Sequence, residues 1–247
     1  MQAQALLPLK DLVEAKSRLS GLLNPAQRRA LTQAMVEDVL SVLAEHPNIS
    51  TVTLVSDDPS ANMLAAKYGI RHWLESSLGC SGLNPVIAQS CERLFQESDQ
   101  PVIVLHGDLP CLQGADISAV LQGLAQCDGL VLACDRHERG TNLLAFGPQN
   151  RIEFAFGVDS CMRHSAAAKK RGIPVQLLHR QGIALDIDEP QDLQLLMRQL
   201  DLGLGGHCAQ LLSDTALGRR IRTQLASMES VPLSSAISTT KISEPKA

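Results

Sequence analysis

Short apolar runs alternate with longer amphipathic stretches along the chain as far as Leu200. The runs at 3–9, 51–55, 101–105 and 130–134 are rich in aliphatic residues, which is typical of buried strands. Between these runs, apolar side chains recur at helical spacing, as they do from Leu31 to Leu43. Strands that alternate with crossover helices predict an α/β fold, in which helices cover both faces of a mostly parallel sheet.

Local signals predict where individual elements begin and end. Asn24 precedes Pro25, a pair typical of a helix start, and Pro47 lies just past the end of that helix. We expect Asn84 to cap a second helix and Asp188 to cap the last one. Further helices are predicted over 61–67, 116–125 and 160–171, extended segments over 70–74, 143–146 and 175–179, and a polar loop over 10–20.

The character of the chain changes after Leu200. A glycine-rich breaker at 201–206 precedes a polar helix, and residues from about Glu229 are rich in Ser and Thr. Such a tail has too few large apolar side chains to offset the entropy lost on ordering. We expect one domain over 1–203 and a C-terminal extension over 204–247 with a disordered end. Alternatively, apolar residues of this tail would add a strand to a sheet edge or reach across a homodimer.

The composition excludes several classes of partner. The 247 residues carry a formal net charge of −4 and only 2% aromatic residues, so neither nucleic acid nor an anionic membrane is an expected partner. No segment approaches the roughly 20 apolar residues of a membrane span, and the N-terminus lacks the basic start of a signal peptide. Seven cysteines without a CxxC pair are typical of free thiols in a reducing cytoplasm, rather than of a disulfide scaffold or a zinc site.

Two acidic clusters follow predicted sheet elements. Asp108 comes directly after the run 101–105, and Pro110 stiffens the turn behind it. A second cluster contains Asp186 and Asp188. Ligands of open α/β sheets bind at the carboxyl ends of strands, and Mg²⁺ prefers one or two carboxylates together with phosphate oxygens. The clusters therefore suggest metal and phosphate chemistry, although a plain turn and an acidic helix start explain each cluster alone about equally well.

Cations and glycine-flanked hydroxyls supply further candidates. Three cations follow the first strand, namely Lys10, Lys16 and Arg18. They form either a clamp for a triphosphate or an ordinary solvated basic loop. Neither a GxGxxG nor a GxxxxGK[ST] loop is present. Thr141 lies in the loop segment Gly-Thr-Asn, and Ser160 follows Gly157 at a helix start, where a hydroxyl either binds a small anion or merely caps the helix.

Taken in order, these segments resemble one family. They are PLK…AKSRL at 8–19, GLNPVI at 82–87, GDLPCL at 107–112, DR…GTNLL at 135–144, FGVDSCMRH at 156–164 and LDIDEPQDL at 185–193. The set resembles the guanylyltransferases of coenzyme F-420 biosynthesis over roughly residues 3–200. The ordered combination is far more specific than any single motif.

The resemblance implies a nucleotidyltransferase fold of the glycosyltransferase-A type, GTP and Mg²⁺ as co-reactants, and a product that joins GMP to a phosphorylated three-carbon acid. The acid would be 3-phospho-D-glycerate, phosphoenolpyruvate or 2-phospho-L-lactate. By motif match, Asp108 and Lys16 would be catalytic. The metal would be held by Asp108, Asp186 and Asp188, the GTP by Lys10, Lys16, Arg18 and Asn84, and the acid by Thr141, Gly157 and Ser160.

The chain departs from the family pattern at His106-Gly107, in the polar loop 135–140 and beyond residue 204. The first two departures would reshape the pocket that the resemblance implies for the phosphorylated acid. Two other classes of function stay open on the residues alone: a metal-dependent phosphatase with Asp186 or Asp188 as nucleophile, and a nucleotide-binding module without catalysis.

Overall fold

A computed structural model describes residues 1–10 and 16–229. The strands are β1 (Ala3–Pro8), β2 (Ile49–Val55), β3 (Arg71–Trp73), β4 (Val102–Leu105), β5 (Leu130–Cys134), β6 (Thr141–Phe146) and β7 (Val175–Leu177). The α-helices are α1 (Pro25–Glu45), α2 (Ala61–Tyr68), α3 (Leu83–Glu97), α4 (Gly114–Cys127), α5 (Ser160–Lys170), α6 (Gln181–Ala184), α7 (Pro190–Asp201), α8 (His207–Leu212) and α9 (Ala216–Glu229). Two 3-10 helices, η1 (Ser17–Leu19) and η2 (Glu75–Leu78), complete the described elements.

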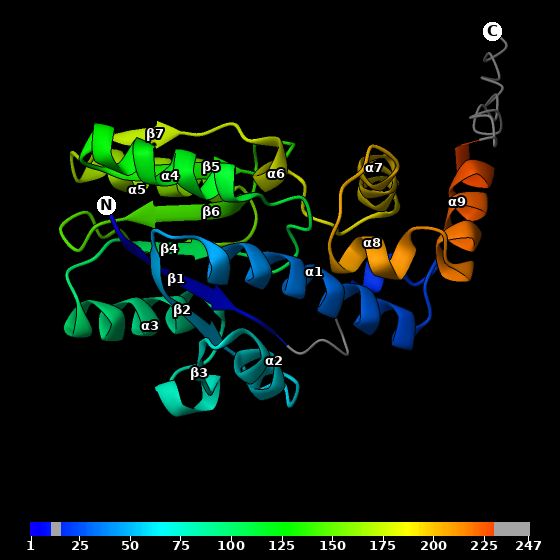
Figure 1. Ribbon diagram of the computed structural model, residues 1–247. Helices are drawn as coiled ribbons and strands as arrows, with labels where there is room; N and C mark the ends of the chain where they lie inside the picture. Colours follow the sequence, from blue (N-terminus) through cyan, green and yellow to red (C-terminus); the bar gives the residue numbers. More distant parts are fainter. Residues whose placement is uncertain (11–15, 230–247) are drawn as a thin grey trace, which may run out of the picture.

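The strands form one seven-stranded sheet in the order β3-β2-β1-β4-β6-β5-β7 (Figure 1). All neighbouring pairs are parallel except those of β6, which runs antiparallel to β4 and β5. The predicted mostly parallel sheet is therefore confirmed. The reversal of β6 follows from the short loop 135–140, because a parallel connection needs a crossover of about a dozen residues or more.

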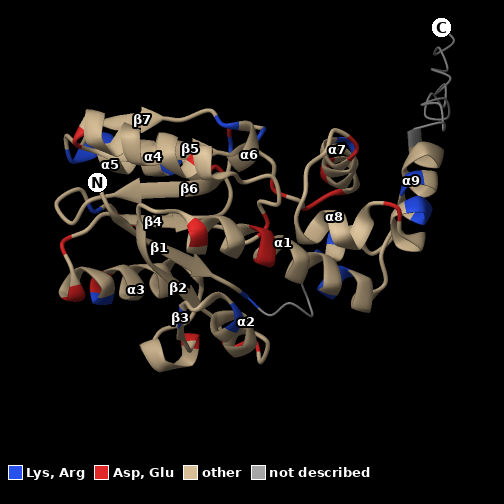
Figure 2. Ribbon diagram, in the orientation of Figure 1, with Lys and Arg blue, Asp and Glu red and all other residues tan. Residues whose placement is uncertain are grey.

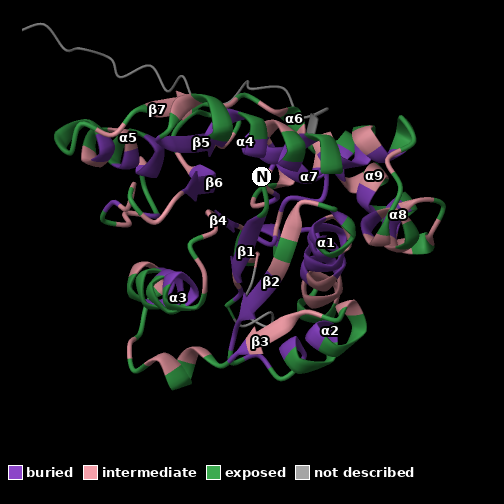
Figure 3. Ribbon diagram, turned by 60° about the vertical axis from the view of Figure 1, so that its left-hand side comes forward, coloured by how far each residue is buried: buried purple, intermediate pink, exposed green. Residues whose placement is uncertain are grey.

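The sheet is apolar on both faces, as its runs predicted. Every strand except β3 is free of charged residues, which lie on the helices and loops (Figure 2). In β1, Ala5 and Leu7 face the core covered by α1, α2 and α4, whereas Leu6 faces the core covered by α3 and α5. Figure 3 shows the central strands largely buried between helices that are exposed on their outer sides, whereas the edge strands β3 and β7 are mostly of intermediate burial.

A third apolar cluster joins the C-terminal helices to the start of α1. It contains Leu31 and Met35 of α1, Leu196 of α7, Cys208 of α8 and Ile221 of α9. The helices α7, α8 and α9 lie together beside one end of α1 (Figure 1). The predicted disorder after Glu229 falls outside the described residues, as does part of the predicted loop 10–20.

The structure tests the predicted helix starts. The Asn24 cap of α1 is confirmed, with its side chain accepting from the Gln27 backbone N–H. The predicted caps Asn84 and Asp188 are wrong, because Gly82 and Glu189 occupy those positions. Ser160 is the first residue of α5 and Asp159 is its cap. The Asn84 amide is instead paired with the backbone of a distant loop.

The expectation of free thiols throughout is also wrong. A disulfide joins Cys134, at the end of β5, to Cys161 in the first turn of α5. These two residues are 27 positions apart, and only the sheet order brings their segments together. The described free cysteines are Cys80, Cys91, Cys111, Cys127 and Cys208. No helix in the described part of the chain is both long and apolar enough to cross a membrane.

Candidate active site

The candidate residues gather at the edge where the parallel strands end. Asp108 follows β4, and the backbone N–H of Ile187 donates to the Asp108 carbonyl at 3.3 Å. This backbone contact joins the two acidic motifs, which are far apart in sequence. Because β6 is antiparallel, its first residue, Thr141, lies at the same edge and pairs with Cys134 at the end of β5.

Lys16 lies between two of the carboxylates. Its Nζ donates to Asp108 Oδ2 at 2.5 Å and to Asp188 Oδ1 at 2.7 Å. Lys16 directly precedes η1 and has a left-handed backbone conformation with φ 59°. Its side chain is only 7% exposed, against 24% for Asp108 and 48% for Asp188. The ammonium group is therefore the counter-ion of an inner carboxylate and a more open one.

The charges in this group depend on one another. Burial alone would lower the pKa of Lys16, but the charges of Asp108 and Asp188 outweigh it and raise that pKa to about 12. Burial would raise the pKa of Asp108, yet the charges of Lys16 and His106 hold it below its usual value. Lys16 and Asp108 are consequently both ionised at neutral pH.

Asp186 differs from Asp108 in the direction of its pKa shift. Burial and the nearby charge of Asp108 raise its pKa. The Asn142 side chain donates to Asp186 Oδ1 at 3.2 Å and to the Ile183 carbonyl at 2.9 Å. Asn142 thereby links the start of β6 to the second acidic motif.

The second acidic motif is oriented by a further carboxylate. Asp192 Oδ2 accepts from the backbone N–H groups of Asp188 and Glu189, while Asp192 Oδ1 accepts from Arg136. Asp192 is buried, so its charge is balanced by these donors. The start of α7 is thus held while the Asp188 side chain faces the cleft.

A cleft of about 950 Å³ lies beside the Lys16 group. Its lining comes from the ends of β1 and β4, from α1, from the segments after β2 and β3, and from the start of α3, and includes Lys10, Lys16, Asp57, Glu75, His106, Asp108 and Asp188. Gly107 forms part of the wall, where a Cβ would lie 3.0 Å from the Val36 side chain. A space of this size at this edge matches a nucleotide.

Two of the predicted GTP residues do not line this cleft. Arg18 is largely exposed and pairs with Glu189 at 3.2 Å. Asn84 holds a loop, since its Oδ1 accepts from the Phe156 N–H at 2.7 Å and its Nδ2 donates to the Phe156 carbonyl at 3.2 Å. Lys10 and Lys16 do line it.

A second, more buried group lies further along the same edge. Thr141 is 2% exposed and Ser160 is 1% exposed. Gly157 has φ +122°, a backbone conformation that side chains other than glycine rarely adopt. The hydroxyl of Thr141 is 3.0 Å from Nδ1 of His164, one helical turn after Ser160.

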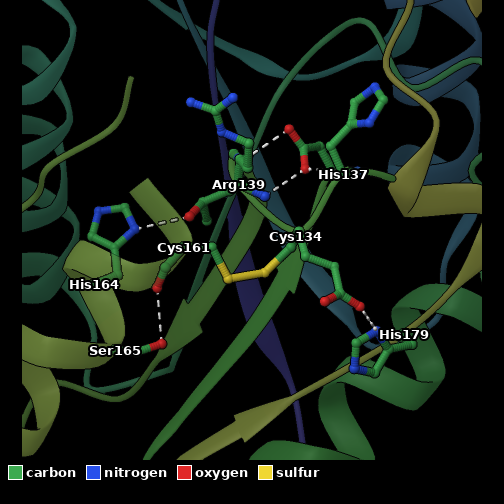
Figure 4. The surroundings of a disulfide bond; sticks show 11 residues. Cys134, His137, Arg139, Cys161, His164, Ser165 and His179 are labelled. Carbon is green, nitrogen blue, oxygen red and sulfur yellow. Dashed lines mark hydrogen bonds and ion pairs between the residues drawn. A yellow bond between two sulfur atoms is a disulfide. The ribbon is translucent and has the colours of Figure 1, made fainter. Parts of the chain in front are cut away.

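The segments around these hydroxyls are tied together. Asp135 accepts from three backbone N–H groups of the loop 135–140, including that of Arg139 at 2.8 Å. The Arg139 carbonyl accepts from the Cys161 N–H at 3.0 Å, and the Cys134–Cys161 bridge lies beside it (Figure 4). The loop that departs from the family pattern is therefore fastened to the first turn of α5.

Comparison with known protein families identifies the family to which the chain belongs. The family described as "Guanylyl transferase CofC like" matches residues 3–213. The chain belongs to this family. The match covers every motif identified above and extends into α8.

Named relatives agree with the family match. A phosphoenolpyruvate guanylyltransferase of Sphaerobacter thermophilus is 36% identical over 203 residues, which cover 82% of this chain and 96% of that protein. A 3-phospho-D-glycerate guanylyltransferase of Phenylobacterium zucineum is 34% identical over 215 residues, covering 86% and 96%. This CofC-like protein is thus a guanylyltransferase by family.

Solved structures support the fold. A protein from Desulfovibrio desulfuricans G20, provisionally named a nucleotide-diphospho-sugar transferase, superposes with a TM-score of 0.75 at 16% identity, covering 90% of this chain and 98% of that one. CMP:2-keto-3-deoxy-manno-octonic acid synthetase, complexed with CTP, gives a TM-score of 0.53 at 15% identity, covering 83% and 100%. The nucleotidyltransferase fold of the guanylyltransferase is therefore confirmed.

Three site residues were missed by sequence reasoning. Asn142 contacts Asp186, His106 lines the cleft, and His164 contacts Thr141. His106 and His164 also pack against the ring of Phe156, with ring centroids 5.5 and 4.8 Å from that of Phe156. Asn142 could have been found from its place in the Gly-Thr-Asn segment. The two histidines show no metal-ligand spacing in the sequence that could have identified them.

Proposed function

We propose that this guanylyltransferase condenses GTP with a phosphorylated three-carbon acid and releases pyrophosphate, as a step in coenzyme F-420 biosynthesis. The acid is phosphoenolpyruvate, 3-phospho-D-glycerate or 2-phospho-L-lactate; the first two are the acids in the names of its relatives. The observation that carries the proposal is the buried Lys16, paired with carboxylates of both acidic motifs at the wall of a nucleotide-sized cleft.

The reaction depends on the neutralisation of negative charge more than on a general base. A phosphate oxygen of the acid attacks the α-phosphorus of GTP, a P–O bond forms there, and the bond to the β-phosphate breaks. Phosphate monoesters are already largely anionic at neutral pH, so no proton has to be removed first. Lys10 and Lys16 would neutralise the charge that builds on pyrophosphate, and the edge of the sheet would align the two anions.

The carboxylates fit the magnesium ion that such a reaction uses. Among the described residues, Asp108 Oδ1 is buried and has no hydrogen-bond partner, and Asp186 has a raised pKa because of its burial and the neighbouring charge of Asp108. Both features favour a cation nearby. Mg²⁺ held by Asp108, Asp186 and Asp188 would polarise the triphosphate.

The metal site is not preformed. No three His, Cys, Asp or Glu side chains within residues 1–10 and 16–229 are arranged to hold a metal ion. The Lys16 ammonium lies between Asp108 and Asp188 instead. We therefore propose that Lys16 leaves one carboxylate and turns toward the triphosphate when the metal and GTP bind.

The acid would bind at Thr141, Gly157 and Ser160. The hydroxyls of Thr141 and Ser160 offer donors for a phosphate or a carboxylate. The acid's attacking phosphate would then lie between this group and the Lys16 group. We also propose a cytoplasmic location, because GTP and phosphorylated acids of central metabolism are supplied there.

The decisive experiment is a pyrophosphate-release assay of the three acids against the four nucleoside triphosphates, with Mg²⁺ or with EDTA. We expect release with GTP, Mg²⁺ and at least one acid, and mass spectrometry should detect the GMP-linked acid. Release of inorganic phosphate from the acid without GTP would instead support the phosphatase. GTP binding without any turnover at high enzyme concentration would overturn the catalytic proposal.

A further inference from the structure

His164 is a fully buried histidine whose two ring nitrogens both have partners. It lies on α5, close to the Cys134–Cys161 bridge (Figure 4). Nε2 lies 2.9 Å from the backbone nitrogen of Ala155, and Nδ1 lies 3.0 Å from Thr141 Oγ1. It therefore joins the loop before α5 to the first residue of β6.

We propose that His164 is a positioning residue that orients the Thr141 hydroxyl as a hydrogen-bond donor toward the acid substrate. The proposal rests on the proposed function, since it assumes that Thr141 contacts the acid. It concerns a residue that would never touch the substrate itself.

The hydrogen-bond pattern leaves one tautomer. A backbone N–H can only donate, so Nε2 must accept from Ala155 and cannot carry a proton. A neutral ring then carries its proton on Nδ1, which donates to Thr141 Oγ1. One lone pair of Thr141 Oγ1 accepts this hydrogen bond, so the hydroxyl hydrogen of Thr141 points away from His164.

The surroundings keep this ring neutral. His164 is 0% exposed, and the ring of Phe156 packs against it in a T-shaped arrangement at 4.8 Å between centroids. Burial, together with the charge of Arg163, lowers the pKa of His164 to about 4. A charged imidazolium would have protons on both nitrogens and would lose the Ala155 contact.

The tautomer matters because the ligand is an anion. If Nδ1 were the acceptor, the only hydroxyl hydrogen of Thr141 would be directed to the histidine. Lone pairs would then face the phosphate or carboxylate of the acid. The Nδ1–H tautomer removes this conflict before the substrate arrives, so less reorganisation accompanies binding.

Two substitutions separate the roles of the ring nitrogens. In His164→Gln, the side-chain oxygen reaches the Nε2 position and can accept from Ala155, but no donor reaches Thr141. In His164→Asn, the amide nitrogen occupies the Nδ1 position and can still donate to Thr141. We expect His164→Gln to raise the KM for the acid about tenfold with the KM for GTP unchanged, and His164→Asn to raise it about threefold or less.

A double-mutant cycle with Thr141→Val tests whether His164 acts through Thr141. Once the hydroxyl is gone, His164→Gln should raise the KM for the acid no further. Additive effects of the two substitutions, or equal losses in the Gln and Asn variants, would overturn the proposal. Thr141→Ser in the wild-type background should restore most of the acid affinity that Thr141→Val loses.

Nitrogen NMR of the histidine rings supplies a readout that needs no activity. We expect His164 in the wild-type protein to show a protonated Nδ1 and an unprotonated Nε2 at neutral pH. The opposite tautomer would overturn the proposal even if every variant behaved as predicted. If the wild-type protein shows the expected tautomer but no guanylyl transfer with any acid, the proposed function fails and the orientation of Thr141 stands.

Discussion

Two regions at the same sheet edge are built on different physical principles. The cleft region is charged, and Lys16, Asp108 and Asp188 hold one another by ion pairs at 2.5 and 2.7 Å. The side chains of Thr141 and Ser160 are uncharged and almost fully buried. Their region is held by backbone hydrogen bonds, a buried histidine and a disulfide.

The difference matches what each region would have to do. Ion pairs beside a wide cleft can exchange partners. A metal ion can take the place of Lys16 beside the carboxylates, and phosphates can take the place of the carboxylates beside Lys16. Hydrogen bonds between buried groups are exchanged less readily, because water cannot replace a lost partner. We infer that the cleft rearranges on binding, whereas the proposed acid site is preorganised.

The largest effect is expected from Asp108→Asn. Losing this charge removes a partner of Lys16 and, on the proposed function, a metal ligand, so kcat should fall by about 10²-fold or more. The melting temperature should change little, because the residue lies in a turn at the edge of the sheet. Stopped assays of pyrophosphate release measure the loss, and the exposed Asp99→Asn is the matched control. A kcat near the wild-type value would mean that Asp108 is only a turn residue.

Ser160→Ala should affect the acid rather than GTP. Removing one buried donor, at about 1–3 kcal/mol, should raise the KM for the acid about ten- to a hundredfold. Ser165→Ala serves as the control, because the Ser165 hydroxyl donates to the Cys161 carbonyl within the same helix. Steady-state kinetics with each substrate varied decides the matter. If the KM for GTP rises instead, the two regions have been assigned the wrong way round.

Reduction of the Cys134–Cys161 bridge should loosen only the acid pocket. The bridge closes a loop with a sequence separation of 27 residues, so its loss should lower the free energy of unfolding by about 2–4 kcal/mol. We expect the KM for the acid to rise severalfold in Cys161→Ser and the KM for GTP to stay constant. Cys80→Ser changes a free thiol and is the control. Unchanged melting after full reduction would show that the bridge adds nothing to the preorganisation.

The last prediction concerns the stability of the protein at low pH, and its effect is absent above neutral pH. The pKa of His164 is lowered from 6.5 to about 4 in the folded protein, so below pH 6.5 the unfolded chain binds more protons at this residue. Its contribution to stability is therefore complete above pH 6.5 and is lost as the pH falls toward 4, by about 3 kcal/mol in all. Urea unfolding of the wild-type protein and His164→Asn across this range should give curves that converge at low pH. Parallel curves would mean that His164 titrates normally.

Local patterns predicted much of the fold and part of the site. The aliphatic runs, the Asn24–Pro25 start of α1 and the strand before Asp108 each depend on a few neighbouring residues, and the structure confirms all three. The ordered motifs also led to the family. These features depend on backbone geometry and side-chain burial over short stretches, which is information that a sequence carries directly.

What remained could be decided only by tertiary structure. The sheet order joins Cys134 to Cys161, brings Lys16 between Asp108 and Asp188, and sets His164 against Thr141. Each of these contacts joins segments that no local periodicity relates. A lone lysine or histidine has the same local signal whether it is solvated, buried or catalytic. Its role is set by the charges and donors that folding brings within about 3 Å of it, because electrostatic and hydrogen-bond energies depend on that distance and on the exclusion of water.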